Sequence, residues 1–161
     1  MEALGEIQIR EFLAAHGLKR RIRTFAESTR NAALAAQALG VDRGQIVKSL
    51  LFLADDQPVL ILMSGDMNVH TKKLKQHLRV RKLKIADAET VFKVTGYPVG
   101  GVPPVAHRQP IPTALDVSLQ RFSKIYPAAG SSNSMFCSTF AELLQLAGAE
   151  IIDVAAPRKE T

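Results

Sequence analysis

The sequence of 161 residues contains a single cysteine, Cys137. One thiol excludes an internal disulfide framework and a zinc site built from several cysteines, and it suits a reducing compartment. Cys137 also lies in the apolar segment MFCS, which favours a core thiol over a nucleophile. We therefore expect neither a disulfide nor a catalytic cysteine.

Long hydrophobic runs are also missing. The longest, Pro58–Met63, is far shorter than the ~20 residues that span a bilayer. The N-terminal sequence MEALGEIQIREF lacks the basic segment and following apolar segment that mark a secretory signal. We therefore expect a cytoplasmic protein that does not engage a membrane.

The motifs of several enzyme classes are absent. The sequence contains neither GxSxG nor HExxH, and its glycine-rich loop lacks the GK[ST] ending of a P-loop. Four histidines are scattered along the chain, and no carboxylate or cysteine lies near enough in sequence to His70 and His77 to complete a set of metal ligands. The sequence predicts no metal site and no cofactor.

What is present is typical of one globular domain. Hydrophobic residues make up 47% of the chain and charged residues 22%, which excludes disorder, collagen and coiled coil as descriptions of the whole chain. The length suits a single core, and no repeat or composition shift divides it. We expect one domain over residues 1–161, with residues 155–161 as a flexible polar tail.

Short helices and strands alternate irregularly, which predicts the α+β class with a mixed sheet and peripheral helices. Apolar residues at helical spacing predict helices over 9–16 and 32–39, each followed by a glycine. Two apolar runs, 46–54 and 58–63, are joined by Asp55-Asp56-Gln57 and predict a central hairpin. Shorter strands are expected at 20–25, 114–117, 124–128, 135–137 and 151–154.

Polar residues mark where the later helices should begin. Asn68 and Asp87 are suited to cap two short helices, the second of which should end at Gly96. Thr139 and Glu142 have the spacing of a capping box for the last helix.

Lys48 is the most informative single residue, because it interrupts the apolar run IVKSLLF. Alternation places it on the same strand face as Ile46, Leu50 and Phe52. An ammonium among core-facing side chains is costly unless it is paired or faces a cavity. It is therefore either a lysine in a pocket, directed at an anion or a developing oxyanion, or an edge lysine whose head reaches water.

Two loops are further candidates. The segment Gly100-Gly101-Val102-Pro103-Pro104 combines backbone freedom with rigidity, so it could direct N–H groups at a substrate or be only a well-made turn. The segment Ala129-Gly130-Ser131-Ser132-Asn133 could line a pocket with small polar side chains or be an ordinary polar turn.

The positive charge is concentrated in one segment. The chain has a formal net charge of +6, and seven cations without an anion lie between Asp66 and Asp87. This basic segment favours polyanion binding over a merely solvated helix face. Its members are Lys72, Lys73, Lys75, Arg79, Arg81, Lys82 and Lys84.

Together, QIVKSLLF around Lys48, the loop GYPVGGVPP and the segment YPAAGSSN resemble the YbaK/ProX family. Its members are free-standing aminoacyl-tRNA deacylases related to the editing domain of bacterial prolyl-tRNA synthetase. The resemblance covers about residues 25–154. It implies a compact α+β fold with a barrel-like mixed sheet, and metal-independent cleavage of the ester between a wrong amino acid and the terminal adenosine of tRNA.

The resemblance also implies roles for particular residues. Lys48 matches the lysine that holds the terminal phosphate or the ester region. Gly100 to Pro104 match the family's GxxxP loop, so Gly100 and Gly101 would polarise the ester carbonyl through backbone N–H groups, beside Val102, Pro103 and Pro104. Phe25 would lie at the pocket mouth. The aminoacyl pocket would be lined by Gly130, Ser131, Ser132 and Asn133.

Three departures bear on specificity. Met135 takes the place of an acidic residue found in members that act on cysteinyl-tRNA, AGSSN replaces their GGKRG-like turn, and Val105-Ala106-His107 replaces a glycine-containing continuation of the loop. These departures favour serine, threonine or alanine over cysteine, with Ser132 and Asn133 recognising a small hydroxylated side chain.

The resemblance implies tRNA as the partner, with the basic segment on the acceptor stem. Since no nucleophile is evident, polarisation by Lys48 and the loop, followed by attack of water or a ribose hydroxyl, is the expected mechanism. A non-catalytic tRNA-binding module, a synthetase-associated module and an enzyme for another small ester or amide stay open as alternatives. The amino acid, the tRNA, the oligomeric state and the need for a synthetase partner are left open by the sequence.

Overall fold

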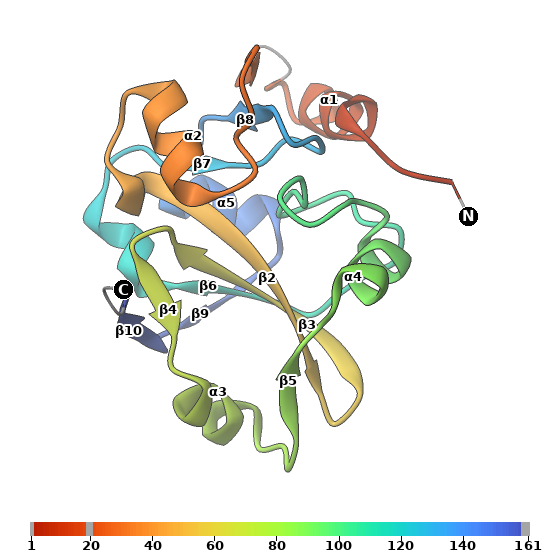
Figure 1. Cartoon of the computed structure of the whole chain (residues 1–161), viewed down its shortest axis with the longest axis vertical. Coiled ribbons are helices and arrows are strands. Elements are labelled where there is room, and N and C mark those ends of the chain that lie inside the picture. Colours follow the sequence, from red (N-terminus) through yellow and green to blue (C-terminus); the bar gives the residue numbers. More distant parts are fainter. Residues whose placement is uncertain (1, 19–20, 159–161) are drawn as a thin grey trace.

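The two apolar runs form a long hairpin across the middle of the molecule (Figure 1). In the computed structural model, which describes residues 2–18 and 21–158, β2 (Ile46–Ala54) pairs antiparallel with β3 (Gln57–Ser64). Asp55 and Asp56 connect them with φ angles of 47° and 66°, the left-handed pair that a two-residue hairpin turn needs. The predicted hairpin is confirmed.

The sheet around this hairpin is mixed, as expected. β6 (Thr113–Asp116) runs parallel to β3, and β9 (Glu150–Ile152) runs parallel to β6. On the other side of β2 lie β5 (Leu83–Ile85), antiparallel, and β7 (Tyr126–Pro127), parallel. Within the described residues the sheet ends at β9 on one side and at β5 and β7 on the other. It is therefore an open sheet, and the expected barrel-like closure is wrong.

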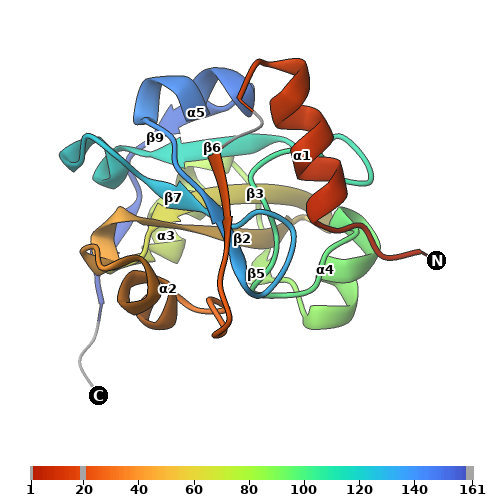
Figure 2. The same cartoon turned by 90° about the horizontal axis from the view of Figure 1, so that it is seen from above.

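The helices lie around the rim of this sheet, which confirms the α+β class with peripheral helices (Figure 2). Two short 3₁₀ turns, η2 (Arg43–Gln45) and η3 (Val117–Arg121), accompany them. The α-helices of the described chain are α1 (Glu6–Ala15), α2 (Ala32–Leu39), α3 (Thr71–Leu78), α4 (Ala88–Thr95) and α5 (Phe140–Leu146). No helix in the described ranges has both the length and the apolar character needed to cross a membrane.

Two antiparallel ribbons complete the fold, and the isolated bridges Ile125–Ser138 and Ala128–Met135 link the first of them to the segment around β7. β1 (Ile22–Thr24) pairs with β8 (Ser134–Phe136), and β4 (Met67–Val69) pairs with β10 (Ala155–Pro157). β1 is shorter than the predicted strand 20–25, of which Arg20 lies outside the described residues.

The helix caps agree with the sequence in part. The Asp87 carboxylate accepts a hydrogen bond from the Thr90 N–H at 2.8 Å, as expected of an N-cap. Thr139 caps α5, but the Glu142 carboxylate accepts from Arg21 and Ser138 rather than closing the capping box. The prediction for Asn68 is wrong: this residue lies in β4 and pairs with Ala156.

The core is divided between the two faces of the hairpin by the alternation of side chains along β2. Val47 and Leu51 pack in one cluster with the fully buried Tyr97. Phe52 packs on the opposite face, in a cluster with Leu74 of α3. Lys48 lies on the strand face of Phe52, as its position in the alternation predicts.

The prediction of a flexible tail over 155–161 is wrong for its first residues. Ala155, Ala156 and Pro157 form β10 and pair in register with Val69, Asn68 and Met67. Backbone pairing of this kind requires only free N–H and C=O groups. The polar composition of the segment therefore did not predict a strand. Residues 159–161 of the predicted tail lie outside the described residues.

Ending the chain after Val154 should therefore lower the free energy of unfolding by about 1–2 kcal/mol, because the ladder on β4 is lost. The matched control ends after Arg158 and keeps β10. Urea unfolding of both truncated proteins measures the difference. Equal stability of the two would show that β10 contributes nothing.

Candidate active site

The outer edge of β2 is only partly paired, and a cavity opens where the pairing is missing. β7 covers Ile46 and Val47, whereas β5 covers Phe52 to Ala54. Between them a cavity of about 240 Å³ is bordered by β2 from Ile46 to Leu50. The gap in strand pairing thus positions the cavity.

Three other parts of the chain complete the walls. One wall is the start of α2, and a second is the loop after α4. The third wall consists of Ala128, directly after β7, and Met135 of β8, and Arg43 of η2 also borders the cavity. The residues from these parts are Thr29, Arg30, Asn31, Ala32, Arg43, Val99, Gly100, Val102, Ala128 and Met135.

Lys48 is half-buried in this cavity wall, and its Nζ donates a hydrogen bond to the Met67 carbonyl oxygen. Burial lowers the pKa of the Lys48 ammonium, and the positive charge of Arg43 lowers it further. The nearby Asp66 carboxylate opposes this shift. The cavity interpretation of Lys48 is thus the one that the geometry fits, with donor capacity left after the bond to Met67.

Asp66 is itself tied to a neighbouring cation. Its carboxylate accepts hydrogen bonds from the Arg121 guanidinium at 2.6 and 3.1 Å. The Arg121 hydrogen bond holds the pKa of Asp66 below its usual range, with a further contribution from Ser64. Asp66 therefore stays ionised and fixed beside the turn that leads into β4.

The glycine-rich loop approaches the cavity through close backbone packing. Gly100 has φ +90°, and a Cβ there would lie 2.8 Å from the Arg30 carbonyl oxygen. A Cβ on Gly101 would lie 3.0 Å from the Ser131 backbone. Only residues without a side chain let this loop contact both neighbouring segments so closely.

The two glycines differ in what their N–H groups do. The Gly101 N–H donates to the Pro98 carbonyl oxygen at 3.0 Å, within the turn. Among the described residues, the N–H groups of Gly100 and Val102 donate to no other group of the chain. Gly100 and Val102 border the cavity, whereas Pro103 and Pro104 are buried outside its lining. The N–H groups of Val99, Gly100 and Val102, which all border the cavity, are thus without a partner within the described chain.

The loop continues into a strained turn. Ala106 has φ +63°, a left-handed conformation that alanine rarely adopts. After it, His107 folds back so that its Nε2 lies 2.7 Å from the Pro103 carbonyl oxygen. Burial lowers the pKa of His107, so the neutral imidazole donates this hydrogen bond.

The second predicted loop braces the cavity wall rather than lining the cavity. The Ser132 carbonyl oxygen accepts from the Thr29 N–H at 2.7 Å, and Asn133 exchanges hydrogen bonds with the Phe25 backbone. Phe25 and Gly130 to Asn133 lie outside the residues that border the cavity. Their contribution to substrate binding stays a prediction, and their observed contacts hold the segment that leads into Thr29.

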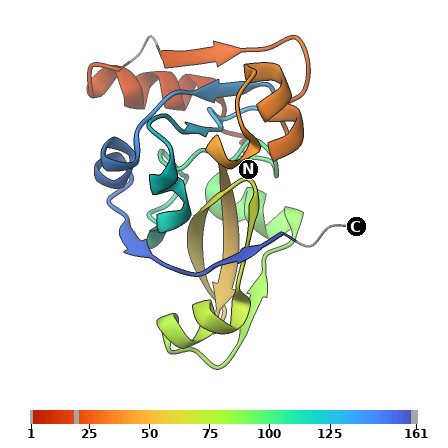
Figure 3. The ribbon, with the colours of Figure 1, turned by 90° about the vertical axis from the view of Figure 1, so that its left-hand side faces the viewer.

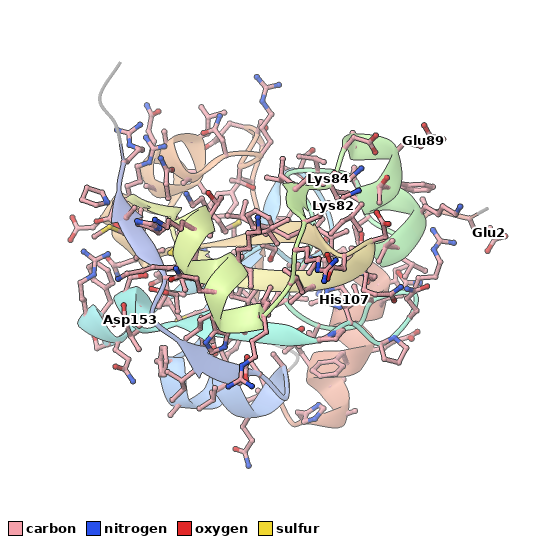
Figure 4. All side chains as sticks on the ribbon, turned by 90° about the horizontal axis from the view of Figure 1, so that it is seen from below. Glu2, Lys82, Lys84, Glu89, His107 and Asp153 are labelled. Carbon is pink, nitrogen blue, oxygen red and sulfur yellow. The ribbon has the colours of Figure 1, made fainter. Side chains whose placement is uncertain are left out.

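The basic segment lies at the opposite end of β2 from the cavity, on and after α3 (Figures 1 and 3). All seven of its cations are exposed. The Asp55 carboxylate accepts from the backbone N–H groups of Arg81 and Lys82. The Lys82 hydrogen bond is the main reason that the pKa of Asp55 is lowered. Figure 4 views the molecule from this end and labels Lys82 and Lys84.

Four cavity residues had no distinguishing signal in the sequence: Thr29, Arg30, Asn31 and Arg43. The Asn31 side chain caps α2 by accepting a hydrogen bond from the Leu34 N–H. This capping role accounts for an asparagine at this position, so the residue gives no indication of ligand binding. The two arginines lie outside the basic segment, and Arg43 belongs to the turn directly before β2. The packing of α2 against β2 brings Arg30 to the cavity, whereas Arg43 is placed there by the turn that leads into β2.

Within residues 2–18 and 21–158, no group of three or more histidine, cysteine, aspartate or glutamate side chains is placed to hold a metal ion. The polar side chains that border the cavity are three cations, the hydroxyl groups of Thr29 and Ser49, and the amide of Asn31. Such a set suits an anionic or carbonyl-bearing ligand.

Comparisons with known proteins agree on one family. The model of a family described as the aminoacyl-tRNA editing domain matches residues 26–146. The Bacillus subtilis protein YwhH, which is uncharacterised, is 36% identical over 132 residues, covering 81% of this chain and 83% of YwhH.

Prolyl-tRNA synthetases contain a related segment. The proline–tRNA ligase of Citrifermentans bemidjiense is 35% identical over 99 residues, which are 62% of this chain but 17% of the ligase. Among solved structures, a protein described as "a putative trans-editing enzyme for prolyl tRNA synthetase" is 35% identical, with a TM-score of 0.87. That match covers 94% of this chain and 96% of the other.

Ala106→Gly should stabilise the protein by about 1 kcal/mol, because glycine adopts the left-handed conformation without the steric cost that alanine has. Thermal and urea unfolding measure the change. Ala33→Gly, at an exposed site within α2, is the control and should destabilise by a similar amount. If Ala106→Gly also destabilised the protein, the turn would not be strained as described.

Proposed function

The chain belongs to the aminoacyl-tRNA editing domain family, and from that premise we propose that it hydrolyses mischarged aminoacyl-tRNA, releasing a small amino acid. Serine, threonine and alanine are favoured over cysteine. The observation that carries the proposal is the cavity at the edge of β2, which is bordered by Lys48 and by Gly100 and Val102 of the glycine-rich loop.

The reaction needs stabilisation of a negative charge rather than a nucleophilic side chain. Attack of an oxygen nucleophile on the ester carbonyl carbon moves the π electrons onto the carbonyl oxygen, and collapse of this intermediate releases the terminal ribose hydroxyl. The N–H groups of Gly100 and Val102, together with the Lys48 ammonium, supply positive dipoles and charge for that oxygen. Water serves as the nucleophile in the step that frees the amino acid, and its proton passes to the departing ribose oxygen. Attack by the adjacent ribose hydroxyl would only move the aminoacyl group along the ribose, so water must still complete the hydrolysis. The proposed mechanism uses no metal ion.

The size and lining of the cavity support a small amino acid. Its volume of about 240 Å³ is below the ~300–1,000 Å³ typical of pockets for larger ligands. Ala32, Ala128 and Met135 border it, and Met135 stands where an acidic residue would suit cysteine-specific relatives. Ser132 and Asn133 are proposed to influence recognition of a hydroxylated side chain from behind this wall.

The basic segment is proposed to hold the acceptor stem. Lys84 pairs with Leu53, five residues along β2 from Lys48, which is about 17 Å at the usual rise of a strand. One RNA molecule can contact both places at this separation. A tRNA substrate also implies action in the cytoplasm, with prolyl-tRNA synthetase as the first synthetase partner to test, given the relatives of this chain.

Lys48→Met should reduce deacylation about 10²–10³-fold, because the ammonium beside the ester is lost. The test uses tRNA charged with Ser, Thr, Ala, Cys or Pro, with tRNA for proline first among the acceptors. Selective cleavage of one or two esters by the unaltered protein would also identify the amino acid.

Stability separates this loss from misfolding. Since burial disfavours the charged form of Lys48, an apolar side chain of similar length should change the free energy of unfolding by less than about 1 kcal/mol. Lys124→Met, which removes an exposed cation beside β7, should leave deacylation unchanged. Cleavage that survives Lys48→Met would overturn the site. No cleavage of any ester above the spontaneous rate would favour a non-catalytic tRNA-binding or synthetase-associated module.

Charge reversal in the basic segment should weaken tRNA binding for every aminoacyl group alike. Lys84→Glu should reduce affinity several-fold and flatten its dependence on salt, because phosphate contacts release counterions. Titrations at several salt concentrations measure both effects. Lys124→Glu carries the same charge change outside the segment and should have a smaller effect. Equal effects of the two would show that only net charge matters.

A further inference from the structure

We infer that His107 is a positioning residue of the candidate active site, because its imidazole fixes the loop in which Gly100 and Val102, whose N–H groups have no partner within the described chain, border the cavity. The inference rests on the proposed function for its catalytic consequence. His107 itself does not border the cavity, so it acts through the loop.

The first part of the argument is a hydrogen bond across the loop. His107 Nε2 lies 2.7 Å from the carbonyl oxygen of Pro103, the residue directly after Val102. The pyrrolidine ring already fixes φ of Pro103. Holding its carbonyl oxygen as well leaves the backbone next to Val102 little freedom to turn.

A second hydrogen bond holds the same loop from the other side. The Tyr97 hydroxyl donates to the Ala106 carbonyl oxygen at 2.7 Å, and the Tyr97 side chain is fully buried. The Tyr97 and His107 rings meet edge to face, with centroids 6.5 Å apart. The Arg108 N–H donates to the Thr95 carbonyl oxygen at 2.9 Å and closes the base of the loop.

The third part is the conformation of Ala106. Its φ of +63° is unfavourable for a residue with a side chain, so it persists only where surrounding contacts enforce it. The bonds from Tyr97 and His107 lie on either side of this turn. The chain thus maintains a strained turn that brings the imidazole back onto Pro103.

Preorganised donors stabilise a developing charge only if they keep their geometry, and small displacements of reacting groups are costly to the rate. Loss of the His107 hydrogen bond should therefore reduce kcat much more than it changes KM. The acceptor stem and the cavity walls would still bind the substrate.

The test compares His107→Leu, which removes the donor, with His107→Gln, whose Nε2 can still donate to Pro103. His107→Leu should lower kcat about 10–100-fold with KM within about threefold. His107→Gln should retain kcat within about threefold of the unaltered protein. If the leucine variant kept its kcat, or if the glutamine variant lost as much as the leucine variant, the inference would be overturned.

A readout that needs no activity separates this inference from the proposed function. The Gly101 N–H is bonded to Pro98 inside the loop, so its hydrogen exchange reports loop order. His107→Leu should speed its exchange at least about tenfold, and His107→Gln should not. Unchanged exchange in His107→Leu overturns the inference even if no ester is ever cleaved. Should His107→Leu fail to fold, both measurements are made in the Ala106→Gly background, which relieves the strained turn.

Discussion

The arrangement of this protein depends on the incomplete pairing of one strand. β2 is nine residues long, but its outer edge is covered only at its two ends, by β7 and by β5. An uncovered edge in the middle of a sheet would ordinarily be a liability, because its backbone groups remain available for pairing. Here the start of α2 and the loop after α4 approach that edge instead of a strand, and the cavity is what their approach leaves open. The lysine in the uncovered stretch, Lys48, therefore reaches a solvent-accessible space from within a buried hairpin.

The close approach of the loop after α4 to its neighbours requires glycine at two positions. Gly100 contacts the backbone of Arg30, and Gly101 contacts the backbone of Ser131. Contact of backbone with backbone leaves little room for adjustment, so the loop is set in place by packing rather than by its own hydrogen bonds alone. β10 contributes from a distance, because it pairs with β4 at Met67, whose carbonyl oxygen holds the Lys48 ammonium.

The central hairpin and the position of Lys48 could be predicted from the sequence because their signals are local. The hairpin follows from two apolar runs and the short polar joint Asp55-Asp56-Gln57, and Lys48 is conspicuous because a charge interrupts one of those runs. Features that depend on distant packing were not foreseen. Thr29 and Arg30 reach the cavity only through the placement of the start of α2, and β10 forms by backbone pairing that no side-chain pattern indicates. The open sheet was missed for the same reason, since closure is decided by which distant strands meet.

Lys48 and the basic segment lie in different environments, and their charges therefore interact differently with a ligand. Lys48 is half-buried beside Arg43, where the surroundings screen charge weakly, so a negative charge developing nearby interacts strongly with it. The basic segment is exposed, and its charges are screened by salt over about 8–10 Å. In the proposed function, the exposed cations would therefore act on encounter and on the affinity for a long polyanion, whereas the half-buried ammonium would act on the reacting group. Because one strand, β2, carries Lys48 near one end and supports Lys84 near the other, the distance between these two residues is fixed by the hairpin itself.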